Sequence, residues 1–153
     1  MRISLENPDQ PDVIRLIDEL DAYQIPLYPL ESHHGIDIDA LRQPNVLFAV
    51  ARTDAGEAIG CGAIVVEPEY SELKRMYVHP AQRGQGIAQR LLACLETAAR
   101  ERGCREFALE TGFRQPEAIR FYEQAGYIRC GPFGDYTDDP NSIFMRKAAP
   151  EAT

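Results

Sequence analysis

The stretch Arg83-Gly84-Gln85-Gly86-Ile87-Ala88 decides the fold of this chain. An apolar, strand-like run from Leu73 to Val78 precedes it, and a helical pattern of apolar residues follows it. The first N–H groups of a helix have no partner inside the helix, and the aligned peptide dipoles place partial positive charge there. Glycines let the backbone approach an anion closely. A strand, a basic glycine turn and a helix therefore predict a site for a phosphate or diphosphate group.

The spacing within this turn separates it from two common phosphate-binding motifs. A P-loop needs Lys and then Ser or Thr directly after its last glycine, where this chain has Ile87 and Ala88. A dinucleotide fingerprint needs a third glycine where Gln89 stands, and it follows the first strand of its unit rather than one in mid-chain. What remains is Arg-x-x-Gly-x-Ala after Leu-x-Arg-Met-Tyr-Val, with an ordinary strand-to-helix turn as the alternative.

Length and composition indicate one globular domain. The chain has 153 residues, 44% hydrophobic and 26% charged, and we expect a single domain over residues 1–147 and a flexible tail over 148–153. No apolar run is long enough to span a bilayer, and the first residues lack the apolar core of a secretory signal, so a cytoplasmic location is expected.

The net charge of the chain and the spacing of its cysteines and histidines limit which partners and metals the protein is expected to bind. The net charge of −8 argues against nucleic acid as a partner, although it permits a cationic acceptor such as an amine. The four cysteines and three histidines show no zinc-type spacing, so no metal site is expected.

The apolar patterns predict a mixed α/β domain. A turn at residues 53–57 predicts an antiparallel hairpin, whereas the long helix should link two parallel strands. Arginines in its last turn and Gly103 beyond it are typical of a helix end. Strands are expected at residues 2–6, 46–52, 58–67, 72–79, 105–110, 127–130 and 142–147, and helices at 12–23, 36–43, 85–102 and 116–125.

A second motif lies at Gln115 to Tyr127. It resembles the pattern Asn-x-x-Ala-x-x-Phe-Tyr-Glu-x-x-Gly-Phe, with Gln and Tyr in place of the first Asn and the last Phe. Together with the glycine turn, this motif resembles the GCN-related N-acetyltransferase (GNAT) superfamily, whose element order matches nearly the whole chain. The resemblance implies a central, mostly antiparallel mixed sheet with a splayed parallel strand pair, flanked by helices. It also implies an acetyl-CoA-dependent acetyltransferase that needs no metal.

The resemblance implies a particular role for each part of the cofactor site. The strand before the turn offers backbone groups to the pantetheine arm, the turn holds the diphosphate, and the second motif completes the site. A fully paired central strand and a solvated Arg83 are the alternatives. The expected cofactor-binding residues are Met76, Tyr77, Val78, Arg83, Gly84, Gln85, Gly86, Ile87, Ala88, Gln115, Ala118 and Phe121.

Acetyl transfer to an amine needs a base and an acid. An alkyl amine has a pKa of ~10 and a leaving thiol one of ~8.5, so the first must lose a proton and the second must gain one. The resemblance implies Glu72 as the base, with Glu110 or a water chain as alternatives, unless Glu72 is exposed or paired with Lys74 or Arg75. It implies Tyr122 as the acid, unless Tyr122 is a core tyrosine with a satisfied hydroxyl.

The sequence identifies the acceptor less well than the cofactor. We expect a small primary amine, such as an amino acid or a polyamine, and a homodimer is permitted though not required. The alternatives are a protein lysine or N-terminus as acceptor, and a non-catalytic acyl-CoA-binding module. A pocket capped by residues 24–43 would favour the small molecule. The candidate acceptor-binding residues are Tyr28, His33, His34, Glu110 and Tyr136.

Overall fold

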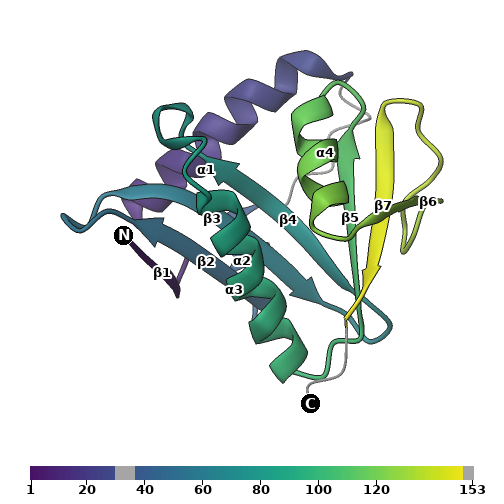
Figure 1. Cartoon of the computed structure of the whole chain (residues 1–153), viewed down its shortest axis with the longest axis horizontal. Helices are drawn as coiled ribbons and strands as arrows, with labels where there is room; N and C mark the ends of the chain where they lie inside the picture. The colour runs from purple at the N-terminus through teal and green to yellow at the C-terminus, as the bar shows by residue number, and fades with distance from the viewer. Residues whose placement is uncertain (30–36, 150–153) are drawn as a thin grey trace.

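The computed structural model describes residues 1–29 and 37–149, and within them one sheet of seven strands forms the centre of the molecule. The strands lie side by side in the order β1-β2-β3-β4-β5-β7-β6 (Figure 1). Neighbouring strands are antiparallel except β4 and β5, which are parallel. The strands are β1 (Arg2–Leu5), β2 (Val46–Arg52), β3 (Ala58–Val66), β4 (Ser71–Val78), β5 (Glu106–Gly112), β6 (Ile128–Cys130) and β7 (Ser142–Ala148).

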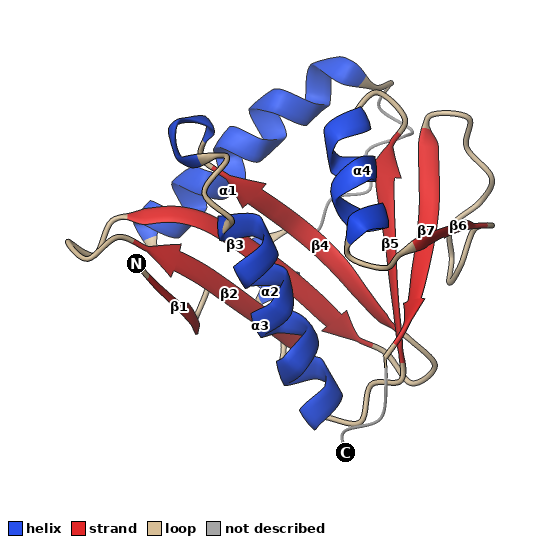
Figure 2. Ribbon diagram, viewed as in Figure 1, coloured by secondary structure: helices blue, strands red, loops and turns tan. Residues whose placement is uncertain are grey.

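Helices cover both faces of this sheet (Figure 2). Helices α3 (Ile87–Glu101) and α4 (Pro116–Gln124) lie on one face, and α1 (Pro11–Gln24) and the short α2 (Ile38–Leu41) lie on the other. This arrangement confirms the predicted mixed sheet between helices and its single crossover from β4 through α3 to β5. Two 3₁₀ turns complete the described elements, η1 (Ile25–Leu27) and η3 (Pro80–Gln82).

The sheet has an apolar layer on each face because its strands alternate their side chains. On β4 and β5, Leu73 and Leu109 face α3, whereas Glu72 and Glu110 belong to the face on which α1 lies. Between the sheet and α3, Leu91 and Leu95 of the helix pack with Phe107 and Met145 of the strands. On the other face, Val13 and Leu16 of α1 pack with Val50 and Ala63 of the strands. Glu72 of β4 and Glu110 of β5 therefore share one face.

The glycine turn sets where α3 begins. Gly86 has φ 77°, a left-handed conformation that side chains disfavour, and the helix starts at Ile87 rather than at residue 85 as predicted. At the other end, Gly103 with φ 92° follows the last turn, as the sequence indicates. The predicted helix over 36–43 is shorter, Ile38–Leu41.

The C-terminal strand is longer than predicted. Ala148 pairs with Glu106 at the end of β7, and the N–H of Ala149 donates to the carbonyl of Arg105 at 2.8 Å. Ala148 therefore belongs to β7, and Ala149 is hydrogen-bonded directly after it, which corrects the predicted end of the last strand at residue 147. Residues 150–153 of the expected tail lie outside the described residues.

A bulge in β4 changes which side chains face each helix layer. Arg75 has φ 59°, and the pairing with β3 shifts there by one residue. Met76 consequently packs on the α3 side and Tyr77 on the α1 side. Gly62 makes room for the bulge, because a Cβ at that position would lie 2.3 Å from the sulfur of Met76.

Strands β4 and β5 separate soon after they begin. Their parallel pairing covers only Ser71–Leu73 with Phe107–Leu109, and beyond it the two strands diverge (Figure 1). This confirms the predicted splayed pair and excludes a β4 that is fully paired on both sides.

Candidate active site

Two cavities meet where β4 and β5 separate. The larger, of about 640 Å³, lies on the side of α1, and the smaller, of about 410 Å³, lies beside the start of α3 and α4. Their lining residues overlap, so the two spaces are neighbours at the opening of the sheet. The residues that line both are Leu20, Met76, Gln115, Ala118 and Tyr122.

The smaller cavity gathers most of the residues predicted to bind the cofactor. They come from the end of β4, from the glycine turn and from the first turns of α3 and α4. Gln85 is not part of the lining. The predicted residues that do line it are Met76, Tyr77, Val78, Arg83, Gly84, Gly86, Ile87, Ala88, Gln115, Ala118 and Phe121.

The start of α3 presents a row of amide donors to this cavity. The N–H groups of Gly84 to Gln89 have no protein acceptor within the described residues, and no side chain caps the helix. The first backbone bond into the helix runs from the N–H of Arg90 to the carbonyl of Gly86, at 3.1 Å. Unpaired donors at the positive end of a 15-residue helix can bind an anion.

Arg83 is tied to the end of β4. Its Nε donates to the carbonyl of Val78 at 3.0 Å, and its guanidinium carbon lies 5.8 Å from the ring centre of Tyr77. The side chain is exposed, and these two contacts hold its positive charge at the rim of the smaller cavity. The hydroxyl of Tyr77 donates to Glu19 on α1 at 3.2 Å, so this side chain is engaged on the other face of the sheet.

Glu72 lies in a cluster of polar side chains in the larger cavity. It is 8% exposed, and its Oε2 accepts a hydrogen bond from the Tyr136 hydroxyl at 2.5 Å. The Lys74 ammonium lies 3.1 Å from the same oxygen and donates to the Tyr136 oxygen at 2.9 Å. The sequence left open whether Glu72 is exposed or is paired with Lys74 or Arg75. The structure shows the pair with Lys74, whereas Arg75 pairs with Asp21 of α1.

Tyr136 keeps its proton in this cluster. Burial raises the pKa of the Tyr136 phenol, and the charge and hydrogen bond of Glu72 raise it further. A phenol with a raised pKa remains protonated at neutral pH, so it acts as a donor toward Glu72. The pairing of Tyr136 with Glu72 joins the loop between β6 and β7 to β4, over a separation of 64 residues.

Glu110 shares the larger cavity with Glu72. In the parallel pairing Glu72 stands opposite Ala108, and Glu110 lies two residues further along β5 on the same face. Its Oε2 accepts a hydrogen bond from Ser142 Oγ at 2.6 Å. Both carboxylates considered as bases therefore line one space.

Tyr122 stands at the meeting point of the two cavities. The residue is 8% exposed, and its ring packs edge-on against Phe121 and Tyr127, with centroids 5.1 Å and 5.7 Å away. Its hydroxyl makes no hydrogen bond within the part of the chain that the structure describes. Burial raises the pKa of the Tyr122 phenol. Tyr122 is thus packed in the core, yet none of the described residues forms a hydrogen bond with its hydroxyl.

Tyr28 closes one side of the larger cavity. Its hydroxyl donates to Gln115 Oε1 at 3.2 Å, and the N–H of Gly112 donates to the same oxygen at 3.3 Å. A Cβ at Gly112 would lie 1.7 Å from the Tyr28 hydroxyl, so only glycine allows this contact. The amide oxygen of Gln115 is therefore used within the protein. His33 and His34 lie outside the described residues.

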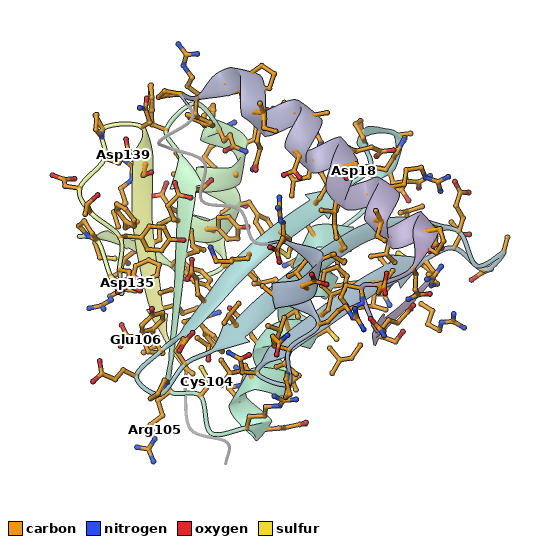
Figure 3. The ribbon with its side chains drawn as sticks, turned by 180° about the vertical axis from the view of Figure 1, so that it is seen from behind. Asp18, Cys104, Arg105, Glu106, Asp135 and Asp139 are labelled. Carbon is orange, nitrogen blue, oxygen red and sulfur yellow. The ribbon has the colours of Figure 1, made fainter. Side chains whose placement is uncertain are left out.

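Other residues of the larger cavity were not predicted as site residues. Thr111 and Asn141 line it from β5 and from the loop before β7, and Asp18 and Asp21 line it from α1. Nothing in their local sequence marks them, because only the packing of distant elements brings them together. Figure 3 shows Asp18 on α1, which crosses this face of the sheet.

Residues 1–29 and 37–149 contain neither a metal-binding cluster nor a membrane-spanning helix. No group of three or more His, Cys, Asp and Glu side chains is arranged there to hold a metal ion. No helix in these ranges has the length and apolar character needed to cross a membrane.

Comparisons with known proteins identify the family. Residues 12–127 match the model of the Acetyltransferase (GNAT) family. The chain is 46% identical over 147 residues to the IAA acetyltransferase of Azospirillum brasilense, covering 95% of each chain. A Klebsiella pneumoniae structure assigned to the acyl-CoA N-acyltransferases superposes with a TM-score of 0.82 at 38% identity, covering 97% of both chains. The PaiA N-acetyltransferase of Thermoplasma acidophilum, solved with coenzyme A, shares the fold, with a TM-score of 0.70 at 19% identity over 97% of this chain and 99% of that chain.

The split sheet and the sequence relationships define an N-acetyltransferase. The chain belongs to the GNAT acetyltransferase family. The family expectation drawn from the two sequence motifs is thereby confirmed, whereas the roles of individual residues stay predictions.

Proposed function

We propose that the protein transfers the acetyl group of acetyl-CoA to a primary amine of a small molecule. The observation that carries this proposal is the meeting of two chemically different cavities at Met76 and Tyr122. One cavity offers amide donors for an anion, and the other is lined by carboxylates. A reaction that joins an anionic acyl carrier to a cationic amine needs these two environments on either side of the reacting atoms.

In this proposal acetyl-CoA occupies the smaller cavity. Its diphosphate accepts hydrogen bonds from the N–H groups of Gly84 to Gln89, beside the charge of Arg83. The pantetheine arm runs along the edge of β4 that β5 leaves unpaired, which brings the thioester to Met76 and Tyr122. The coenzyme A complex of PaiA N-acetyltransferase, a protein of the same fold, supports this assignment.

The proposed reaction is direct attack of the amine on the thioester. Glu72 takes a proton from the ammonium form of the acceptor, either directly or through water, and the nitrogen then bonds to the carbonyl carbon. Backbone N–H groups of the bulged β4 stabilise the oxyanion that develops. The C–S bond breaks as the amide forms, and Tyr122 supplies the proton that converts the departing thiolate into a thiol. The second proton that the nitrogen loses on becoming an amide restores the Tyr122 phenol, directly or through water, and the proton on Glu72 leaves to solvent.

The larger cavity fits a small cationic acceptor. Its volume of about 640 Å³ lies within the range of small-molecule pockets, and α1 and the segment after it form one wall. The described acidic side chains lining the cavity outnumber the basic ones, and the two basic ones, Lys74 and Arg75, are paired with Glu72 and Asp21. A surplus of carboxylates attracts an ammonium group. The acidic lining residues are Asp18, Asp21, Asp37, Glu72 and Glu110.

A thiol-release assay tests this function. The protein is incubated with acetyl-CoA and a panel of polyamines, amino acids and lysine-containing peptides, and free coenzyme A is measured. We expect saturable release with a small amine and none with the peptides. Turnover of peptides alone would show a protein acceptor instead. Release with no acceptor, despite calorimetric binding of acetyl-CoA, would indicate a non-catalytic binding module.

A further inference from the structure

The position of Tyr136 is fixed by an aromatic cluster. Its ring packs edge-on against Phe133 and Phe144, with centroids 5.1 Å and 5.4 Å away, and Phe133 also contacts Tyr70 at 5.3 Å. Gly134 has φ 56°, a left-handed conformation, and a Cβ there would lie 2.3 Å from the Tyr70 hydroxyl, so a larger residue would strain the turn and displace Tyr70. The loop between β6 and β7 thus places one phenol next to Glu72 of β4, packed between two aromatic rings.

The hydrogen bonds of Glu72 are unequally divided between its two oxygens. Oε2 is engaged by both the Tyr136 hydroxyl and the Lys74 ammonium. Oε1 has no partner within the described residues, and the side chain lines the larger cavity. Two charged or polar donors on one oxygen restrain the rotation of the carboxylate and so favour one direction for the other oxygen.

We propose that Tyr136 and Lys74 are positioning residues that fix Glu72 and present its Oε1 to the acceptor amine. This inference rests on the proposed function, since it takes Glu72 as the base. Proton transfer requires the base within hydrogen-bond reach of the amine or of one bridging water, and small displacements are costly. Holding the carboxylate before the acceptor arrives removes the need to order it during the reaction.

Several charged and titratable groups surround Glu72. Lys74 lies on its own strand, Glu110 lies on β5, Tyr136 and Tyr70 approach from the neighbouring loops, and the Asp21–Arg75 pair borders the same cavity. Of these, Tyr136 and Lys74 make the direct contacts with the Glu72 carboxylate. Removing the Tyr136 hydroxyl therefore changes the contacts of Glu72 and leaves the ring and its packing in place.

Tyr136→Phe tests the proposal, with Tyr70→Phe as the matched control. Tyr70 belongs to the same aromatic cluster, and its hydroxyl makes no hydrogen bond to Glu72. We expect kcat of Tyr136→Phe to fall about tenfold, with the KM for acetyl-CoA unchanged, because one charge-assisted hydrogen bond is lost. Tyr70→Phe should match the wild type in both readouts.

A double-mutant cycle separates this inference from the proposed function. If Tyr136 acts through Glu72, then Glu72→Gln with Tyr136→Phe is no slower than Glu72→Gln alone. Full activity of Glu72→Gln would overturn the assignment of the base itself. A slow Glu72→Gln combined with wild-type kcat in Tyr136→Phe would overturn only the positioning role. Should Tyr136→Phe lower the unfolding temperature, Lys74→Met provides a second variant, for which the same direction of change is expected.

Discussion

Replacing Glu72 with Gln is expected to lower kcat by about a hundredfold at neutral pH, with the KM for acetyl-CoA nearly unchanged. The amide keeps the shape of the side chain but cannot accept the proton of the acceptor ammonium. The variant then depends on the fraction of amine that is already neutral in solution, which grows as the pH approaches the amine pKa of ~10. The deficit should therefore be largest at low pH and shrink as the pH rises.

The pH dependence of kcat/KM over the neutral and alkaline range measures this effect. Glu69→Gln is a suitable control because it removes the same charge from an exposed residue just before β4. The control should have the wild-type profile. An unchanged profile in Glu72→Gln would exclude Glu72 as the base and would direct attention to Glu110, which lines the same cavity.

Replacing Tyr122 with Phe is expected to lower the rate of the chemical step by about a hundredfold, with little change in cofactor affinity. The ring and its packing against Phe121 and Tyr127 remain, and only the hydroxyl at the junction of the cavities is lost. The departing thiolate then has to take its proton from water. Burial destabilises the thiolate of coenzyme A and the phenolate of Tyr122 alike. Proton transfer from the phenol to the thiolate therefore stays feasible in these apolar surroundings.

Tyr127→Phe is the control for Tyr122→Phe. The Tyr127 hydroxyl donates to the buried Glu96 at 2.8 Å, away from both cavities, so its loss should lower the unfolding temperature and spare kcat. Single-turnover kinetics and thermal unfolding separate the two outcomes. Wild-type single-turnover rates in Tyr122→Phe would leave Tyr122 with a packing role alone.

The raised pKa of Tyr122 adds a pH criterion to the same experiment. A phenol whose folded-state pKa is raised is protonated below that value, so Tyr122 keeps its proton even at a pH of ~10, the ordinary phenol pKa. The wild-type rate should consequently show no alkaline decline from this group in that range.

The parts of the site that follow one another in sequence could be predicted from it. Gly86 marks the start of α3 because few other residues adopt a left-handed conformation, and the lining of the smaller cavity comes from two short motifs. Element boundaries were predicted within a few residues for the same local reasons. The end of β7 was missed because Ala148 is held by its pairing with Glu106, a contact that no local pattern reveals.

The interior of the larger cavity could not be predicted, because it depends on contacts between distant residues. Tyr136 reaches Glu72 across 64 positions, and Asp21 reaches Arg75 across 54. No glycine at the bulge itself marks Arg75 in the sequence. The space that the bulge needs is provided by Gly62 on the neighbouring strand β3. Tyr136 was predicted as an acceptor-binding residue from its place in the late loop, whereas the structure places its hydroxyl on the candidate base.

Binding of coenzyme A to Gln89→Glu, compared with Gln124→Glu by titration calorimetry, tests most directly whether the diphosphate lies at the start of α3. Both glutamines are exposed and both changes add one negative charge, but only Gln89 lines the smaller cavity. We predict that Gln89→Glu weakens binding about fivefold to tenfold at low salt, and less at high salt, without a loss of stability, because a carboxylate suits a helix N-terminus. Gln124→Glu should bind like the wild type. Equal affinity of the two variants for coenzyme A would contradict a diphosphate site at this helix.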